Sequence, residues 1–184
     1  MYSVRDKPEA SWDFDKKIFI KENVVSREIC EEIIAYGENN VLKGVNKYPN
    51  AFSISFHTCL LPANHYINDL LQSAWEEAIK FLDVDIDFVE PYELKRYNKN
   101  DFFGKHVDSY YSLSHGLDRK LTFSLQLSDV NAYDAGEFNV LSKKFKLSQG
   151  SIICFPSYFP HDVTRIANGT RWALIGWAWG NNWK

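Results

Sequence analysis

The chain has 184 residues, of which 45% are hydrophobic, 16% aromatic and 24% charged, and its formal net charge at pH 7 is −3. A chain of this length can bury a core without disulfides or a structural metal, and so weak a net charge gives no field that would attract nucleic acid or an anionic membrane. We therefore expect a single domain over residues 1–184, with no strong nucleic-acid signal.

The cysteines and the apolar segments indicate the cellular compartment. Cys30, Cys59 and Cys154 stand far apart and form no C-x-x-C pair, so they predict reduced, mostly buried thiols. The first fifteen residues contain no apolar signal core, and the longest apolar run, WALIGWAWG, is too short to span a bilayer. We therefore expect a cytoplasmic protein without a membrane partner; the sequence does not indicate the oligomeric state.

Two amphipathic helices are expected in the first half of the chain, as a helical support over about residues 20–85. Ser26 can cap a helix through REICEEIIAYGENN, residues 27–40. Asn64 can cap a second helix, in which apolar residues follow the i, i+3, i+4, i+7 template over residues 67–82.

The second half, about residues 88–182, is typical of short strands separated by turn residues. LTFSLQLS, residues 121–128, alternates strictly, with leucine and phenylalanine on one face and polar residues on the other. SIICFPS and RWALIGWAW are apolar on both faces, as inner strands of a covered sheet would be. Helices followed by strands predict an α+β domain with the helices packed on one face of a β-sandwich or barrel.

A candidate metal site begins with GKHVDSYY, which places His106 two residues before Asp108. On a strand such residues project to the same side, so they can offer an imidazole nitrogen and a carboxylate oxygen to one ion. Iron(II) in the facial arrangement of two histidines and one carboxylate needs a second imidazole from elsewhere.

The other histidines differ in how well they suit that role. They are His57, His65, His115 and His161. His161 is the best placed, because FPSYFPHDV delivers it after a buried strand and two prolines. His57, on an early strand, is the alternative, and we expect the other two to be solvated.

Arg171 is a candidate anion-binding residue, because PHDVTRIANGTRWALIGW is typical of a β-hairpin. A three-residue loop, 167–169, pairs Arg165 with Arg171 and puts His161, Arg171 and Trp177 on one face, whereas a two-residue loop turns Arg171 to the other face. In the first register the guanidinium can grip a short diacid whose other end chelates a metal at His161. The alternative is that Arg171 forms a surface ion pair.

Together these segments resemble the iron(II)- and 2-oxoglutarate-dependent dioxygenases, in particular the prolyl 4-hydroxylase-like branch of bacteria and phages. The resemblance covers about residues 18–180 and rests on YNKNDFFGKHVD, on RKLTFSLQLSD followed by AGEF, on LSQGSIICFPSYFPHDVTRIANGTRWALIGWAWG, and on the helix VVSREICEEIIAYGEN. It implies a cupin-like double-stranded β-helix (jelly roll) over about residues 88–182, with two supporting amino-terminal helices.

The resemblance also implies roles for individual residues. It assigns Fe(II) to His106, Asp108 and His161, and the distal carboxylate of 2-oxoglutarate to Arg171. Further pocket positions of the family match Tyr97, Thr122, Gln126 and Trp177. Several related hydroxylases carry a tyrosine at the place of Gln126, whose amide can still donate a hydrogen bond. Trp177 is equally compatible with a place in the core.

The implied activity is hydroxylation of a C–H bond, in which dioxygen activation is coupled to decarboxylation of 2-oxoglutarate to succinate. The required cofactors and co-substrates are Fe(II), 2-oxoglutarate and O2, with ascorbate left open as a reductant. A proline in a peptide or protein is the first substrate class, with a free amino acid, another small molecule or a modified base as the alternative. Loops 43–50 and 109–120 are candidate lids, and the setting implied is the cytoplasm of a bacterium or a phage-infected cell.

Two readings of other kinds stay open. A non-catalytic jelly-roll binding module has no physical reason to keep all of His106, Asp108, His161 and Arg171. A cupin-type metalloenzyme that works without 2-oxoglutarate would leave Arg171 with no carboxylate to hold.

Overall fold

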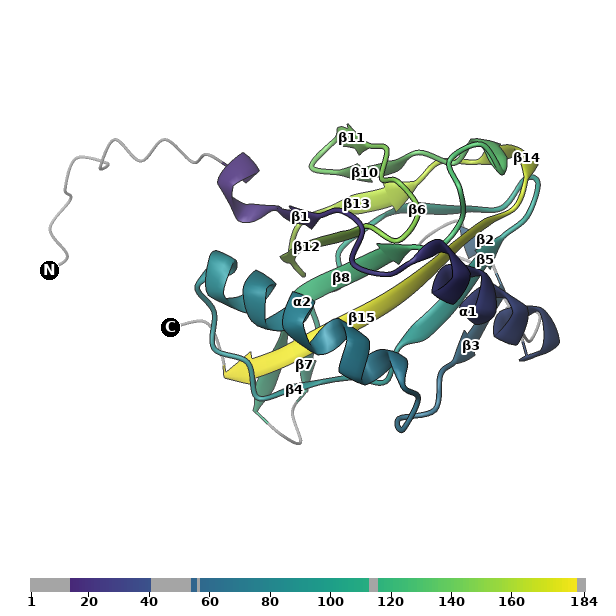
Figure 1. Ribbon diagram of the computed structural model, residues 1–184. Coiled ribbons are helices and arrows are strands. Elements are labelled where there is room, and N and C mark those ends of the chain that lie inside the picture. Colours follow the sequence, from purple (N-terminus) through teal and green to yellow (C-terminus); the bar gives the residue numbers. More distant parts are fainter. Residues whose placement is uncertain (1–13, 41–53, 56, 113–115, 182–184) are drawn as a thin grey trace, which may run out of the picture.

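The computed structural model describes residues 14–40, 54–55, 57–112 and 116–181 (Figure 1). Its helices are the short 3-10 helix η1 (Phe14–Lys17) and the α-helices α1 (Arg27–Asn40) and α2 (Ile67–Leu82). Its strands are β1 (Phe19–Lys21), β2 (Ile54–Ser55), β3 (His57–Leu60), β4 (Phe88–Val89), β5 (Glu93–Tyr97), β6 (Phe102–His106), β7 (Tyr111–Ser112), β8 (Leu117–Gln126), β9 (Tyr133–Ala135), β10 (Phe138–Val140), β11 (Lys143–Phe145), β12 (Ile152–Pro156), β13 (His161–Val163), β14 (Ile166–Gly169) and β15 (Arg171–Asn181).

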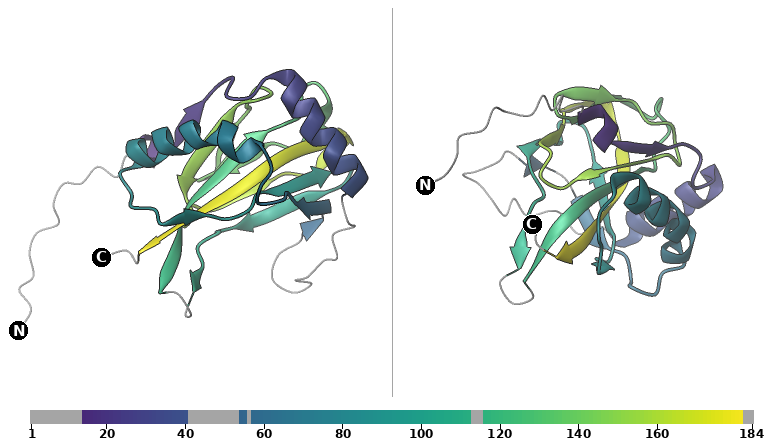
Figure 2. Two further views of the ribbon diagram at one scale, coloured as in Figure 1. Left: turned by 60° about the horizontal axis from the view of Figure 1, so that its bottom comes forward. Right: turned by 90° about the vertical axis from the view of Figure 1, so that its left-hand side faces the viewer.

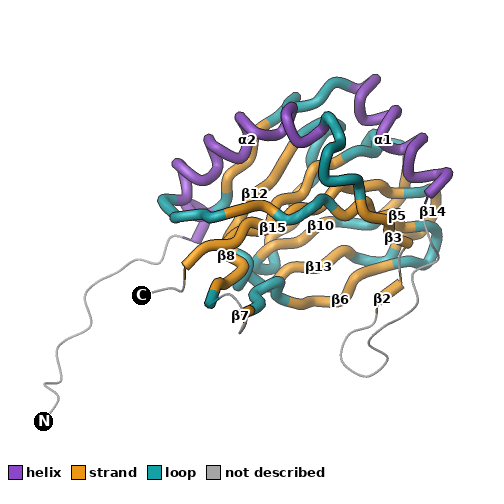
Figure 3. Tube along the Cα trace, turned by 90° about the horizontal axis from the view of Figure 1, so that it is seen from below, coloured by secondary structure: helices purple, strands orange, loops and turns teal. Residues whose placement is uncertain are grey.

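The strands form two principal antiparallel sheets. The larger has the order β1-β12-β8-β15-β5-β3, with β4 paired to β15 and β7 paired to β8. The smaller has the order β11-β10-β13-β6-β2, and β9 and β14 form a separate pair. Figure 3 shows the larger sheet between the two helices and the smaller sheet. The expected double-stranded β-helix with two supporting helices is therefore confirmed.

Both α-helices cover the outer face of the larger sheet (Figure 2). Ile33 of α1 and Leu71 and Trp75 of α2 share one apolar cluster with Leu94 and Phe123 of the sheet. The Trp75 and Phe123 rings stack with their centroids 4.8 Å apart. The apolar stripes seen in the sequence are therefore the faces that bind the sheet. Neither helix, nor any other helix within the described residues, is long and apolar enough to cross a membrane.

The start of α2 differs from the expectation. Asn64 does not cap this helix, because Tyr66 occupies the cap position and makes no capping bond with its side chain. The backbone N–H of Ile67 instead donates to the His65 ring at 3.3 Å. A turn in which the His65 N–H donates to the Pro62 carbonyl at 2.9 Å separates Asn64 from the helix, so the predicted cap lies too far upstream.

Helix α1 is capped as expected and lies unusually close to the sheet. The Ser26 hydroxyl accepts the Ile29 N–H at 3.4 Å. At Gly37 an added Cβ would lie 2.5 Å from Leu94 Cδ2 and 2.5 Å from the Trp172 ring. The absence of a side chain at Gly37 is what lets the helix backbone approach the sheet this closely.

We expect Gly37→Ala to lower the free energy of unfolding. Alanine gains about 1 kcal/mol over glycine in a helix, but forcing a methyl group into a packed contact costs about 1–3 kcal/mol. Because an added Cβ would lie only 2.5 Å from the rigid Trp172 ring, the cost of the clash should exceed the gain in helix propensity. Urea denaturation of the two proteins measures the difference, and a more stable variant would show that the helix can shift to make room.

The alternation in β8 separates the core from the site. Leu121, Phe123 and Leu125 are buried in the cluster under the helices. Thr122 and Ser124 point the other way and line a cavity between the two sheets. Both faces of the strand are therefore buried, and its polar face lines the interior of the jelly roll.

A second apolar cluster lies between the sheets. Its buried members are Tyr97, Phe138, Val140, Ile153, Phe155, Phe159, Val163 and Ile166. They come from both sheets and from the segments beside them, so they hold the two walls of the cavity at a fixed separation.

The predicted hairpin between His161 and Arg171 is wrong. Strand β13, which begins at His161, pairs with β10 and β6 in the smaller sheet, whereas β15, which begins at Arg171, pairs with β5 and β8 in the larger. The intervening β14 pairs with β9, and Arg171 lies opposite Tyr97 rather than Arg165. The fold sends the chain from one sheet to the other here, which covers both faces of these apolar strands. Only the left-handed conformation of Gly169, with φ 75°, agrees with the expected three-residue loop.

The thiols agree with the expectation. Cys30 and Cys154 are buried, Cys59 is half-buried, and none of the three forms a disulfide. Burial raises the pKa of the Cys30 thiol to about 11, and Cys154 shifts in the same direction. These thiols are therefore protonated at neutral pH and act as small apolar side chains.

Parts of the two expected lid loops lie outside the described residues. Residues 43–50 and His115 fall in segments that the structure does not describe. Of the second loop, Tyr111 and Ser112 pair with the start of β8, opposite Asp118 and Leu117.

Candidate metal centre

Three side chains in the cavity between the sheets form a candidate metal site. His106, Asp108 and His161 each offer one ligand atom, and these atoms all lie within 4.8 Å of one another. Asp108 Oδ1 is 3.4 Å from His106 Nε2, and Asp108 Oδ2 is 3.3 Å from His161 Nε2. The sequence predicted this grouping, although the two histidines come from paired strands of the smaller sheet: His106 lies directly opposite His161 in the register of β6 and β13.

Backbone carbonyls orient both imidazoles. His106 Nδ1 lies 2.9 Å from the Gly104 carbonyl oxygen, and His161 Nδ1 lies 3.0 Å from that of Phe159. A carbonyl only accepts, so each Nδ1 donates to its carbonyl, and each Nε2 is the ring atom that faces Asp108 and could bind a metal. The Phe103 ring stacks on His106 with centroids 3.7 Å apart and fixes the plane of that ring. Two imidazoles that bind through Nε2 and one carboxylate are a donor set that suits iron(II).

Asp108 lies just beyond the end of β6 and is held by polar contacts. Its backbone N–H donates to the Ser157 carbonyl at 2.8 Å. Its Oδ2 accepts the Thr122 hydroxyl at 2.9 Å and the Trp177 indole N–H at 2.8 Å. Burial raises the pKa of the Asp108 carboxyl, but hydrogen bonds from His106 and His161 outweigh burial and hold that pKa well below its usual range. The carboxyl is therefore ionised, as a metal ligand must be.

We expect Trp177→Phe to lower metal affinity by about ten- to a hundredfold, which is the usual effect of removing a hydrogen bond to a metal ligand. Phenylalanine keeps the ring in the cavity wall but removes the N–H that orients Asp108. Equilibrium dialysis with Fe(II) under anaerobic conditions measures the effect. Trp179→Phe is the matched control, because the Trp179 indole bonds Glu90 instead; equal affinities in all three proteins would mean that this bond does not support the ligand.

Arg171 lies in the same cavity as the three candidate ligands. It is only 2% exposed, so the surface ion pair considered above is wrong. Its guanidinium carbon is 5.6 Å from the centre of the Tyr97 ring and 5.9 Å from that of Phe138. Burial raises the pKa of Tyr97, so the phenol stays neutral. A buried guanidinium between aromatic rings and close to a metal site is well suited to bind a carboxylate.

Arg171 also lines a second cavity, of about 540 Å³. Gln126 and Tyr133 line it together with Arg171. The Gln126 amide donates to the Tyr133 hydroxyl at 3.1 Å and to the Ser128 carbonyl at 3.0 Å. Gln126 thus lies beside Arg171. Its hydrogen-bond partner Tyr133 also lines this cavity and was not predicted from the sequence.

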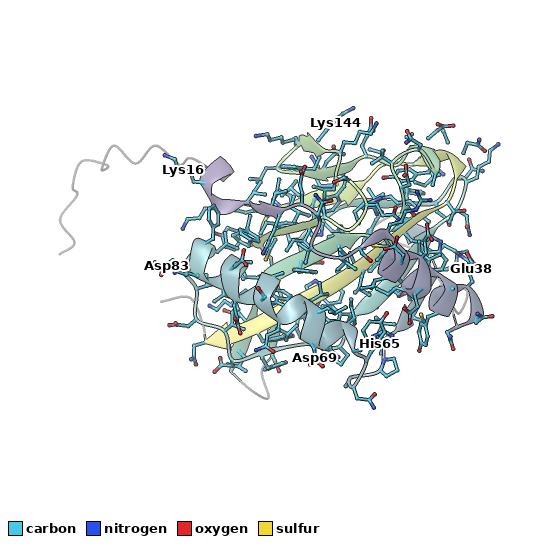
Figure 4. All side chains as sticks on the ribbon, in the orientation of Figure 1. Lys16, Glu38, His65, Asp69, Asp83 and Lys144 are labelled. Atoms are coloured by element: carbon cyan, nitrogen blue, oxygen red, sulfur yellow. The ribbon has the colours of Figure 1, made fainter. Side chains whose placement is uncertain are left out.

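Of the other histidines, those in the described part of the chain lie elsewhere. His57 Nδ1 is 3.8 Å from Asp101 Oδ2 and outside the candidate ligand group. His65 lies beside the amino-terminal end of α2 (Figure 4). Its ring stacks on that of Tyr66 and meets the Tyr36 ring of α1 edge-on. The preference for His161 over His57 agrees with this arrangement.

The structure adds residues that sequence reasoning had missed. They are Lys95, Phe103, Tyr133 and Ser157. Lys95 could have been found, because it precedes Tyr97 by two residues on a strand and so shares its face. Tyr133 follows a turn, and nothing in the local pattern indicates that it folds back onto Gln126.

Comparisons with known proteins agree with this geometry. Residues 92–179 match the model of the 2OG-Fe(II) oxygenase superfamily. A PKHD-type hydroxylase of Prochlorococcus marinus is 39% identical over 79 residues, which are 41% of this chain and 35% of that relative. The chain spans about a third to a half of the length of the curated relatives it matches.

Similar solved structures extend the likeness in fold to most of the chain. A viral collagen prolyl hydroxylase from Paramecium bursaria Chlorella virus-1 superimposes with a TM-score of 0.69 at 19% identity, covering 91% of this chain and 99% of that one. A Trichoplax adhaerens prolyl hydroxylase, in complex with a peptide fragment of hypoxia inducible factor, has a TM-score of 0.66 at 14% identity and covers 89% and 83%. The segment that carries the candidate ligands and the buried arginine is therefore similar in sequence to the 2OG-Fe(II) oxygenase superfamily, and the fold of most of the chain is similar to that of prolyl hydroxylases.

Proposed function

We propose that this protein is an iron(II)- and 2-oxoglutarate-dependent hydroxylase. The observation that carries the proposal is one cavity that holds two oriented imidazoles, an ionised carboxylate and a buried arginine. A binding module would need none of these groups to share a cavity, and a metalloenzyme without 2-oxoglutarate would have no use for the buried arginine.

The proposed roles follow from the contacts. His106, Asp108 and His161 would hold Fe(II), and Arg171 would bind the distal carboxylate of 2-oxoglutarate. When bound, the metal and the co-substrate supply the oxidising power: one oxygen atom of O2 enters the substrate C–H bond, the other enters succinate, and carbon dioxide leaves. Thr122 keeps one ligand in place through its hydrogen bond to Asp108.

The pocket residues matched by the resemblance receive narrower roles. Tyr97 and Gln126 flank Arg171 and would orient the co-substrate carboxylate. Trp177 would fix Asp108 through its indole N–H. Phe103 and the apolar cluster between the sheets exclude water from the reacting end of the cavity.

A proline residue in a peptide or protein is the first substrate to test. A groove of about 300 Å³ at the surface is lined by Phe88, Tyr110, Arg119 and Trp179. Phe88 and Tyr110 are exposed, and such rings can stack on a proline. The Arg119 guanidinium of this groove lies 4.4 Å from the centre of the Trp177 ring, which lines the cavity, so the groove and the cavity are neighbours. The similar prolyl hydroxylase from Trichoplax adhaerens was solved with a peptide.

A free amino acid or another small molecule is the second candidate, and one observation favours it. Lys95, which lines the cavity, forms an ion pair with Glu93 that no part of the proposed reaction uses.

The proposal is tested by succinate formation. We expect the purified protein to convert 2-oxoglutarate to succinate only when Fe(II) and O2 are both present, and His161→Ala to form none. Proline-containing peptides and free amino acids are then screened for a mass gain of one oxygen atom. Succinate formation that does not need added iron, or that survives in His161→Ala, would contradict the proposed site.

A further inference from the structure

Lys95 is a second buried cation in the wall of the cavity. Its side chain lines the same cavity as the candidate metal ligands and Arg171, and the residue is only 5% exposed. The proposed reaction assigns one cation, Arg171, to the distal carboxylate of 2-oxoglutarate. Lys95 is therefore a charged group whose presence in the cavity the reaction does not explain.

The two cations lie at different ends of the cavity. Lys95 Nζ is 5.1 Å from the centre of the Phe103 ring, which stacks on His106, and 5.6 Å from that of Trp177, which bonds Asp108. Arg171 lies opposite Tyr97 in the register of β5 and β15, and Lys95 is two residues farther along β5, or about 6.6 Å. Lys95 thus lies toward the end of the cavity that holds the candidate metal ligands. A substrate must place its reacting C–H bond at this end to be hydroxylated.

Glu93 keeps Lys95 charged. Glu93 Oε2 lies 2.9 Å from Lys95 Nζ. Burial lowers the pKa of Lys95, but the carboxylates near it, above all Glu93, raise it by more, so the net shift is upward. Burying an ammonium is costly, and an apolar side chain of similar size would fill the same space at less cost.

A purely structural ion pair does not account for where the pair lies. Lys95 lines the cavity that holds the candidate metal ligands. Glu93 is two residues away on the same strand, so it lies on the same face of the sheet as Lys95, and it is about one-quarter exposed. This arrangement presents one positive and one negative group side by side.

We infer that Lys95 and Glu93 bind the primary substrate, and that this substrate is a free α-amino acid whose carboxylate faces Lys95 and whose amino group faces Glu93. A free amino acid carries both charges on one carbon and so complements the pair. A proline within a peptide carries neither charge. The inference rests on the proposed function, because it assigns the substrate of the same iron site.

The test is an anaerobic titration of the protein loaded with Fe(II) and 2-oxoglutarate. The ligands are the proteinogenic L-amino acids, the carboxamide of each, and a proline tripeptide blocked at both ends. The readout is the change that a bound substrate causes in the visible charge-transfer band. We expect at least one free amino acid to bind, and its carboxamide and the blocked tripeptide to bind at least about tenfold more weakly.

Single substitutions test whether Lys95 and Glu93 are the residues that bind the amino acid. Lys95→Met should lower the affinity for that amino acid at least about tenfold and keep the 2-oxoglutarate affinity within about threefold of the wild-type value. Glu93→Gln should also lower the affinity for this amino acid. Lys80→Met, on the exposed side of α2, is the matched control and should change nothing. The comparison between each acid and its carboxamide needs no variant, so it holds even if Lys95→Met does not fold.

Each contrary outcome has a definite meaning. If no free amino acid changes the band, if carboxamides bind equally well, or if Lys95→Met binds like the wild type, the inference is wrong. A tenfold loss of 2-oxoglutarate affinity in Lys95→Met would also overturn it, because Lys95 would then belong to the co-substrate site. If the wild type forms no band with iron and 2-oxoglutarate, it is the proposed function that fails.

Discussion

His161→Ala should reduce Fe(II) affinity by more than about a hundredfold, since even removing a partner of a metal ligand costs about ten- to a hundredfold. The change removes one of two imidazoles whose Nε2 atoms face Asp108. His106 and Asp108 would then be the only two candidate ligands left from the group of three. Equilibrium dialysis with Fe(II) under anaerobic conditions gives the affinity directly.

The control for this experiment is His57→Ala. His57 lies by Asp101, outside the candidate ligand group, so its loss should leave Fe(II) affinity unchanged. If instead His161→Ala kept the metal and His57→Ala lost it, the ligand assignment would have to be abandoned.

Arg171→Ala should leave the affinity for Fe(II) unchanged and lower the affinity for 2-oxoglutarate. A charged, bidentate hydrogen-bonded contact contributes about 1.5–3 kcal/mol, which corresponds to about a ten- to a hundredfold change in affinity. The loss should fall near the upper end, because Arg171 is buried between the Tyr97 and Phe138 rings and water cannot readily replace it. Titration of the Fe(II)-loaded protein with 2-oxoglutarate, followed in the visible spectrum, measures the change.

Arg27→Ala serves as the control, because Arg27 lies on the surface of α1 and pairs with Glu31. Its 2-oxoglutarate affinity should equal that of the wild type. Normal diacid binding by Arg171→Ala would show that the co-substrate carboxylate is held elsewhere in the cavity.

The parts of the fold that the sequence predicts are those that depend on local periodicity. The apolar stripe of α2 and the alternation of β8 each reflect a repeat set by backbone geometry, and both were predicted correctly. The proximity of His106 and Asp108 was expected from the same rule, although β6 ends at His106 and Asp108 lies just beyond it.

What the sequence does not predict depends on long-range pairing. His161 and Arg171 are ten residues apart and look like the arms of one hairpin, but each pairs with strands from distant parts of the chain. Both residues line one cavity, but they reach it from different sheets and not from the two arms of one hairpin. Lys95 escaped notice because a lysine on a strand is ordinarily an exposed residue, and only the closing of the second sheet buries it.

The anaerobic visible spectrum of the purified protein, titrated first with Fe(II) and then with 2-oxoglutarate, tests whether the proposed site binds both. We expect a charge-transfer band that appears only when both are present and that is absent in His161→Ala. Iron binding without the band would show that 2-oxoglutarate does not chelate the metal and would favour a metalloenzyme that does not use this co-substrate. Failure to bind iron at all would leave a jelly-roll binding module in which His106, Asp108 and His161 have no catalytic role.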